Sequence, residues 1–364
     1  MPSERRWVMR DWAPGDERAI IALYERVFGK AMGPTESLRH WQWEFRDNPV
    51  PPIAIKLAWD GDRLVAQYTV SPLRLAVEGR EVTACLSHDT MTDPDYQGQG
   101  LFVATATALY EDLARQGVAF VFGFPNANSI AGFVRRLGWT EVMPTPVLVR
   151  PVRVGKLLRD RTGSRVLAAA GDALARAGLA VAGAGARLAG SGWEVRVESG
   201  FGEWADAVWA RCSRQHRVWV VRDRAYLNWR YVTRPESGYV VRSAWDGGTC
   251  AGWAITTDRV SEQGKVRFVM DAIAASDARG ALDALLASVV ADASRDGVEM
   301  ISAIVGPGSP HRATYLRHLF VPLPEKYFPK ELHFGCRPLT DDVGTGVLND
   351  PSAWGLAWGD DDVM

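Results

Sequence analysis

The stretch DTMTDPDYQGQGLF, residues 89–102, decides how the rest of this chain is interpreted. The residues before it, 83–92, are mostly apolar or β-branched and predict a strand. After it, apolar side chains recur at helical spacing until Gly117, which predicts a helix with a glycine at its C-cap. Because glycines at the turn have no side chains, a ligand can reach the backbone N–H groups there. Because a helix N-terminus carries unpaired donors and about half a positive charge, the turn predicts a seat for a phosphate or pyrophosphate.

The loop resembles the acyl-CoA pyrophosphate loop of the GNAT superfamily of N-acyltransferases. The family's pattern is Arg/Gln-x-x-Gly-x-Gly/Ala, and this chain reads Gln97-Gly98-Gln99-Gly100-Leu101-Phe102. Only the sixth residue, small in the family and Phe102 here, departs from the pattern. The resemblance implies that these six residues bind the pyrophosphate of acetyl-CoA, or of another acyl-CoA, as co-substrate. It also implies that the backbone of the preceding strand contacts the acyl carbonyl and the pantetheine at Thr90, Met91 and Thr92.

A second segment carries the same resemblance. NANSIAGFVRRLGW, residues 126–139, is similar to the family's Asn-x-x-Ala…Tyr-x-x-x-Gly-Phe segment, and it adds Asn126, Ser129 and Phe133 to the expected cofactor-binding residues. Many members keep a tyrosine four residues before the glycine, where its O–H can protonate the departing thiolate. Here that position is Val134, so another group or water must take this role.

The resemblance extends over about residues 5–150. The predicted elements run β-α-β-β-β-α-β-α-β, which is the GNAT order, and the last of these strands is expected through Val142–Val149.

Short sequence motifs of this first part recur later in the chain. Trp43 and Trp59 each stand in a short motif that returns at Trp229 and Trp245, in both cases 186 positions on (43 to 229, 59 to 245). Matched offsets at separate motifs indicate a duplicated domain. In the second copy the glycine pair of the cofactor loop is missing, and Arg279-Gly280-Ala281 stands there instead.

We therefore expect an α/β (α+β) protein with two GNAT-like domains, each a mixed, mainly antiparallel twisted sheet flanked by helices. The expected order is an acyl-CoA-binding domain over 1–150, a helical connector over 151–192, a degenerate second copy over 193–340 and a C-terminal tail over 341–364. The degenerate copy is expected to complete the substrate cleft of the first.

Composition excludes several classes of protein. Lys and Arg total 42 against 43 Asp and Glu, so neither nucleic acid nor membrane surfaces are favoured as partners. No apolar run reaches the length of a membrane span. The four cysteines are isolated, which favours reduced thiols in the cytoplasm over a disulfide framework or a metal site.

Two polar residues of the central strand are candidates for catalysis. His88 has an unperturbed pKa suited to accepting the proton of an amine. Asp89 recurs as Asp271 in the second copy, which favours a structural role for it. Neighbouring strand residues point to opposite faces, so only one of the two is expected to face the substrate.

The leading prediction is a cytoplasmic N-acyltransferase that moves an acetyl or other acyl group from acyl-CoA to a primary amine of a small molecule or peptide by direct attack. Two alternatives stay open: an aminoacyl- or peptidyl-transferring tandem GNAT enzyme that uses charged tRNA, and a non-catalytic acyl-CoA-binding protein.

Overall fold

The computed structural model divides the chain into two compact units that do not follow the expected continuous boundaries. It describes residues 7–29, 34–153, 163–164, 166, 169–173, 184–235, 238–261, 264–323 and 332–361. Unit 1 comprises Met1–Thr145, Thr233–Pro235 and Lys330–Asp350, and unit 2 comprises Pro146–Val232, Glu236–Pro329 and Pro351–Met364. Most of the expected connector lies outside the described residues.

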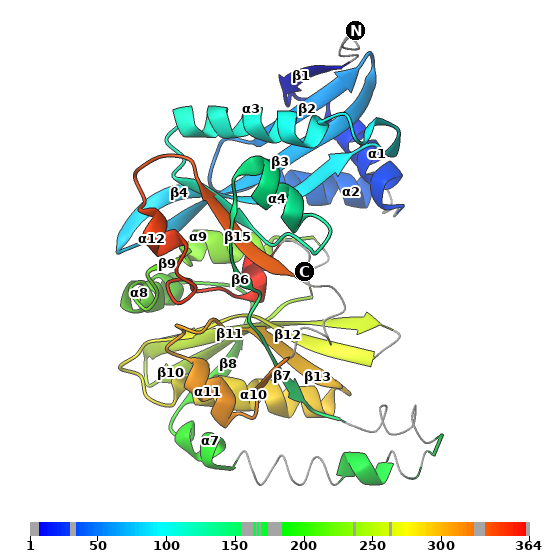
Figure 1. Cartoon of the computed structure of the whole chain (residues 1–364). Coiled ribbons are helices and arrows are strands. Elements are labelled where there is room, and N and C mark those ends of the chain that lie inside the picture. Colours follow the sequence, from blue (N-terminus) through cyan, green and yellow to red (C-terminus); the bar gives the residue numbers. More distant parts are fainter. Residues whose placement is uncertain are drawn as a thin grey trace. The chain divides into compact units, whose positions relative to one another are not determined.

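Unit 1 is built on a mixed, mainly antiparallel sheet, as expected (Figure 1). Its strands stand in the order β1-β2-β3-β4-β5-β15-β6; β4 and β5 pair in parallel, and the other neighbours in this order are antiparallel. Their bounds are β1 Val8–Asp11, β2 Ala54–Asp60, β3 Arg63–Val77, β4 Arg80–Thr92, β5 Phe120–Gly123, β15 His333–Pro338 and β6 Thr140–Pro144.

Helices cover both faces of this sheet. One face packs on α3 (Leu101–Arg115) and α4 (Ile130–Leu137), around a core that includes Tyr68, Leu109 and Trp139. The other face packs on α1 (Glu17–Phe28), α2 (Pro34–Trp41) and η1 (Gln42–Arg46). Both α1 and α4 end at a glycine with positive φ, Gly29 and Gly138, a conformation that glycine adopts without strain. A short helix η2 (Pro94–Tyr96) and α12 (Thr345–Leu348) complete the unit.

Unit 2 repeats the same sheet. Its order β14-β7-β13-β12-β11-β10-β8 matches that of unit 1 strand for strand when read from the other end, and again one pair, β12 with β13, is parallel. The bounds are β14 Val321–Pro322, β7 Val147–Pro151, β13 Met300–Ile304, β12 Gly264–Ala274, β11 Thr249–Ser261, β10 Val240–Asp246 and β8 Glu194–Glu198. The helices are α7 Ala184–Ala189, α8 Glu203–Cys212, α9 Arg224–Leu227, η3 Asn228–Val232, α10 Ala281–Arg295, α11 Arg312–Arg317 and η5 Trp358–Asp360, and β9 spans Val218–Val220.

The two units exchange the strand that completes each sheet. The strand expected through Val142–Val149 is in fact two strands, because β6 stays in unit 1 while β7 pairs with β13 of unit 2. In return β15, from late in the chain, lies between β5 and β6 of unit 1. A continuous first domain over 1–150 is therefore wrong: the sheet of unit 1 is incomplete without residues from beyond 330.

The expected C-terminal tail is also corrected. Residues 351–361 belong to unit 2, where Trp354 and Trp358 are buried. Trp358 donates its indole N–H to Ser302 on β13 at 3.1 Å. The segment is thus part of the core of unit 2.

A rare backbone feature supports the duplication. Gln42–Arg46 and Asn228–Val232 are both single-turn π-helices, and they lie at the offset of 186 found in the sequence (42 to 228). Since π-helices hold well under 1% of residues in globular proteins, two at matched positions indicate a common origin of the units. The structure therefore bears out a chain with two related folds.

The strand exchange predicts that a fragment ending at Arg150 does not fold. Without β15, β5 and β6 lose their shared partner and leave backbone N–H and C=O groups of a buried strand unpaired. We expect the fragment to aggregate and to lack a cooperative thermal transition by circular dichroism.

The matched control joins residues 1–145 directly to 332–350 through a short turn. Thr145 N–H donates to the carbonyl of Leu332 at 3.0 Å, so β6 and β15 are positioned to form a hairpin. This version is expected to unfold cooperatively. A soluble, cooperative 1–150 fragment would contradict the assignment of β15 to this sheet.

Candidate functional site

The glycine loop ends at the N-terminus of α3 and is open to solvent. Gly98 and Gly100 have φ of 76° and 78°, a left-handed conformation that glycine adopts without strain. Residues 97–100 are exposed, and a Cβ built on either glycine would meet no atom within 4 Å. The first turn of a 15-residue helix therefore presents its unpaired N–H groups to an unobstructed space.

Asp93 holds the turn that leads into this loop. Its side chain is 1% exposed, pairs with Arg26 at 3.0 Å and Arg63 at 2.8 Å, and accepts from the backbone N–H of Asp95 at 3.2 Å. Burial opposes ionisation, but the hydrogen bonds from Arg63, Asp95 and Arg26 outweigh it and lower the pKa of the Asp93 carboxyl. The loop thus begins from a fixed, charged anchor.

Phe102 does not obstruct the loop. Its ring packs inward against Tyr68 at 6.1 Å and Phe133 at 5.3 Å between ring centroids. A Cβ on Gly132 of α4 would come within 3.4 Å of it. The large sixth residue of the loop therefore fills the space between α3 and α4, and the helix terminus stays uncovered.

The parallel ladder between β4 and β5 stops short. It pairs Cys85 with Val121 and Leu86 with Phe122, whereas β4 continues to Thr92. Beyond Leu86, β4 therefore has no strand partner on this side among the described residues. Backbone groups of residues 87–92 can thus bind an elongated ligand that approaches from the glycine loop.

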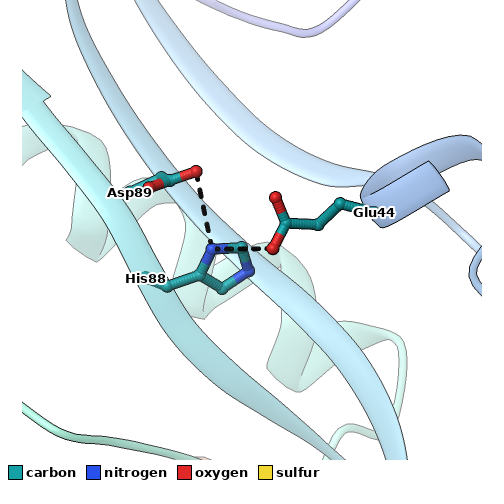
Figure 2. A group of neighbouring side chains, drawn as sticks. All are labelled: Glu44, His88 and Asp89. Carbon is teal, nitrogen blue, oxygen red and sulfur yellow. Dashed lines mark ion pairs between the residues drawn. The ribbon is translucent and has the colours of Figure 1, made fainter. Parts of the chain in front are cut away.

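Three polar side chains converge beside this part of β4 (Figure 2). His88 Nδ1 lies 3.7 Å from a carboxylate oxygen of Glu44 and 3.7 Å from one of Asp89. On its other side, His88 Nε2 is 2.7 Å from Ser71 Oγ, and the ring stacks on Phe45 at 5.5 Å. Both neighbouring residues thus contribute to one cluster, against the expectation that only one would face the site.

The backbone explains this convergence. Asp89 adopts a φ of 47°, which is uncommon for a residue other than glycine, and it lies at a register shift between β3 and β4. The bulge disrupts the strict alternation of side chains between the two faces. Positive φ at a non-glycine residue is typical of a functional constraint.

Accessibility separates the three groups. The side chain of His88 is 1% exposed, that of Glu44 14% and that of Asp89 32%. Desolvation raises the pKa of the Asp89 carboxyl, but the hydrogen bond and charge of His88, with the charge of His40, lower it overall. Asp89 is thus an ionised carboxylate at neutral pH, and an incoming molecule meets the carboxylates rather than the imidazole.

The same three residues could hold a divalent cation. One ligand atom from each of Glu44, His88 and Asp89 lies within 4.8 Å of the others. Ser71, on the far nitrogen of His88, occupies the place of the outer partner that metal-bound histidines usually have. No metal ligands were predicted from the sequence, whereas these three residues are candidate ligands of a metal ion.

The equivalent places in unit 2 are closed. A Cβ on Gly280, at the N-terminus of α10, would lie 2.0 Å from the carbonyl oxygen of Ala189, so the chain itself covers this helix end. Asp271 is 2% exposed and pairs with Arg222 at 2.6 Å, and Arg222 pairs with Asp360 at 2.8 Å. The pocket beside Asp271 is lined by polar and charged side chains that include His216, Arg222 and His311.

A family comparison matches this geometry. Residues 9–142 match the family model described as an acetyltransferase (GNAT) domain. They form a GNAT domain. The segment contains both the open glycine loop and the cluster of Glu44, His88 and Asp89.

Solved structures share the fold of nearly the whole chain. A GCN5-related N-acetyltransferase from Anabaena variabilis is 10% identical, with a TM-score of 0.61 over 92% of this chain and 73% of that one. A probable N-acyltransferase from Enterococcus faecalis is 12% identical, with the same TM-score and coverage. Eis1 from Mycobacterium abscessus is 14% identical, with a TM-score of 0.55 over 94% of this chain and 76% of that one. At such identities the likeness shows the fold alone.

Comparison with curated proteins finds no match. Among the described residues, no helix has both the length and the apolar character needed to cross a membrane. All four cysteines are free thiols, and each is buried.

The remaining predicted residues of the GNAT domain occupy different surroundings. Asn126 is exposed and accepts hydrogen bonds from the backbone N–H groups of Asn128 at 3.0 Å and Ser129 at 3.2 Å, so it organises the start of α4. Met91 is 2% exposed and Phe133 7%, so both side chains belong to the core. Only their backbone can contact a cofactor.

Two residues of the site escaped the sequence analysis. Glu44 reaches His88 because the π-helix at Gln42–Arg46 turns it toward the strand, and the sequence carries no signal for a π-helix. Asp93 lies within residues 89–102, and its position directly before Pro94 could have identified it as a helix-capping residue.

The anchor at Asp93 predicts a pH-dependent loss of stability. Asp93→Asn removes the charge that pairs with two arginines, and we expect a loss of about 1–2 kcal/mol in the free energy of unfolding at pH 7. Because the pKa of Asp93 is lowered by folding, its contribution is present above the unfolded value near pH 4 and disappears as the pH falls through the folded value. Urea unfolding should therefore show the wild type and the variant converging as the pH is lowered below about 4. A gap that stays constant as the pH is lowered would show that the charge of Asp93 contributes nothing.

Proposed function

We propose that the chain is a cytoplasmic N-acyltransferase that transfers an acetyl or other acyl group from acyl-CoA to the primary amine of a small molecule or peptide. One observation carries the proposal. The glycine loop of the GNAT domain is open at a helix N-terminus, directly after a strand whose ladder with β5 ends at Leu86. A pyrophosphate on Gly98–Leu101 and a pantetheine along residues 87–92 use both features.

The acceptor amine is proposed to meet the carboxylates of Asp89 and Glu44. A protonated amine is attracted to these groups, which border a single buried imidazole. His88 is too buried to touch the amine, so the earlier hypothesis of His88 as a direct base changes. Asp89 contacts the ammonium, and His88 adjusts the charge of the cluster.

The reaction then needs no covalent enzyme intermediate. The bound ammonium first releases one proton to solvent, and the neutral amine then attacks the thioester carbonyl. The extra proton that nitrogen carries after the attack passes to the carboxylate cluster. Holding both reactants in one fixed geometry lowers the activation free energy of the reaction. Backbone N–H groups of β4 beyond Leu86 donate to the developing oxyanion.

The other candidate functions make different demands. An enzyme that uses charged tRNA would need a basic surface, whereas the chain has a net charge of −1. A non-catalytic acyl-CoA-binding protein would use the loop but would have no need for the cluster at Asp89. Thiol release from acetyl-CoA with a panel of amines distinguishes an enzyme from a binding protein.

The proposal predicts a single acyl-CoA site. Gly100→Glu places a carboxylate at the helix terminus in a left-handed conformation, and we expect CoA affinity to fall at least a hundredfold by calorimetry. The matched control is Gly247→Glu in unit 2, at a glycine with φ of 55° where a built Cβ meets no atom within 4 Å, and it should leave CoA affinity unchanged. A stoichiometry of two, or unchanged affinity in Gly100→Glu, would contradict the proposal.

The cluster predicts a shift in the pH profile. His88 lowers the pKa of Asp89, so the neutral substitution His88→Gln should let that pKa rise. The acidic limb of kcat/KM for the amine should move to higher pH, while acetyl-CoA affinity stays the same. Asp89→Asn should abolish the limb. An acidic limb unmoved by His88→Gln would remove His88 from the reaction.

A further inference from the structure

A chain of hydroxyl groups ends at the point where β4 and β5 part. Tyr68 OH is 2.8 Å from Ser87 Oγ, and it also contacts the hydroxyl of Tyr110. Trp139 donates its indole N–H to the oxygen of Tyr110 at 2.9 Å. Tyr68, Tyr110 and Trp139 are 0%, 2% and 3% exposed, so bulk solvent does not reach this chain of polar groups.

Counting donors fixes the direction of this chain. The indole N–H can only donate, so the oxygen of Tyr110 accepts from Trp139. The Tyr110 O–H then has one acceptor among the described residues, the oxygen of Tyr68. Tyr68 in turn must donate to Ser87 Oγ, since no other acceptor is within its reach in the described structure. Any other arrangement leaves a buried O–H unsatisfied, which is costly.

Ser87 is therefore left with a hydroxyl proton and no partner for it among the described residues. It is partly exposed and directly follows Leu86, the last residue of β4 that pairs with β5. A Cβ on Gly123 of β5 would come within 2.9 Å of the Ser87 carbonyl oxygen, so the close approach of the two strands holds Ser87 at this point.

The side of the sheet is also informative. The tyrosines and Trp139 belong to the core under α3 and α4, which also contains Phe133. Val134, on the same helix α4, carries no group that can donate a hydrogen bond. The carboxylate cluster instead adjoins η1 and Phe45, which pack in the other core. Ser87 thus supplies a donor on the face opposite to the one where the amine loses its proton.

We propose that Ser87 is a catalytic residue whose hydroxyl donates a hydrogen bond to the sulfur of the leaving CoA thiolate, with Tyr68 and Tyr110 as positioning residues. This inference rests on the proposed acyltransfer. The amine nitrogen bonds to the acyl carbon, the C–S bond breaks, and sulfur leaves with the electron pair as a thiolate. The amine's proton goes to the carboxylate cluster, and the thiolate later takes a proton from solvent.

No proton leaves Ser87 or the tyrosines in this scheme. Burial raises the pKa of Tyr68 well above its usual value and that of Tyr110 to about 12, so both phenols stay protonated next to a thiol of lower pKa. The chain is accordingly a fixed array of dipoles, and its effect is electrostatic stabilisation of the leaving group.

A binding measurement tests the donor without turnover. A hydrogen bond to the thiolate lowers the pKa of the bound CoA thiol, so the wild type should bind CoA progressively tighter than desulfo-CoA as the pH rises from 7 to 9. Ser87→Ala should lose this pH-dependent preference and keep its affinity for desulfo-CoA. Ser87→Thr retains the hydroxyl on a residue suited to a strand and should preserve the preference.

Kinetics provide the second readout. With acetyl-CoA and an amine, Ser87→Ala should lower kcat about tenfold to a hundredfold with an unchanged KM for acetyl-CoA, and Tyr68→Phe should lower it less. An S-aryl thioester, whose thiolate leaves readily without help, should react equally well with the wild type and with Ser87→Ala.

The outcomes separate the two proposals. A wild-type protein that neither binds CoA nor releases thiol from acetyl-CoA would overturn the proposed function itself. A wild-type protein that does both, with Ser87→Ala matching it in the CoA preference and in kcat, would overturn the role of Ser87 alone. Equal losses with acetyl-CoA and the aryl thioester would also overturn it, because they assign the hydroxyl to another atom or to structure.

Discussion

The early end of the parallel ladder between β4 and β5 is the constraint on which the site of this protein depends. A strand that outlasts its partner leaves backbone N–H and C=O groups unpaired, which is unfavourable inside a protein unless a ligand or water satisfies them. In the GNAT domain those groups follow Leu86 and lead directly into the open glycine loop. The same strand carries Ser87 toward one face of the sheet and His88 toward the other. The proposed acyl-CoA site, the carboxylate cluster that meets the acceptor amine and the serine that contacts the leaving thiolate are thus arranged around a single strand.

Unit 2 keeps the same sheet but not the open helix terminus. Its ladder between β12 and β13 also stops, after Val269 and Ala303, while β12 continues to Ala274. The helix terminus that corresponds to the glycine loop is covered at Ala189. The helix terminus that is open in one copy is therefore covered in the other.

The two π-helices show most clearly how the site of unit 1 differs from its equivalent in unit 2. Glu44 of the first corresponds to Arg230 of the second at the common offset (44 to 230). Glu44 lies at the cluster near His88, whereas Arg230 donates to the backbone carbonyls of Gly359 at 3.0 Å and Asp361 at 2.8 Å. Asp271, the counterpart of Asp89, is likewise engaged with Arg222. The recurrence of aspartate in both copies therefore does not assign Asp89 a structural role, because only Asp271 is neutralised by an arginine.

The features that were predicted correctly from the sequence are those that depend on interactions between residues close together in the chain. Gly117, predicted to end the helix after the glycine loop, has a φ of 78°, and the turn before α3 has the conformation that its glycines require. The exchange of β7 and β15 could not be predicted, because strands of equal apolar character fit either sheet and only long-range pairing decides between them. Glu44 was missed for the same reason: its approach to His88 depends on a local π-turn and on tertiary packing.

Hydrogen exchange of backbone amides with and without acetyl-CoA tests the central claim most directly. If the cofactor occupies the open terminus and the unpaired edge of β4, the amides of residues 98–101 and 87–92 gain protection and those of residues 279–283 do not. Protection confined to the loop of unit 2, or shared equally between both loops, would contradict the account.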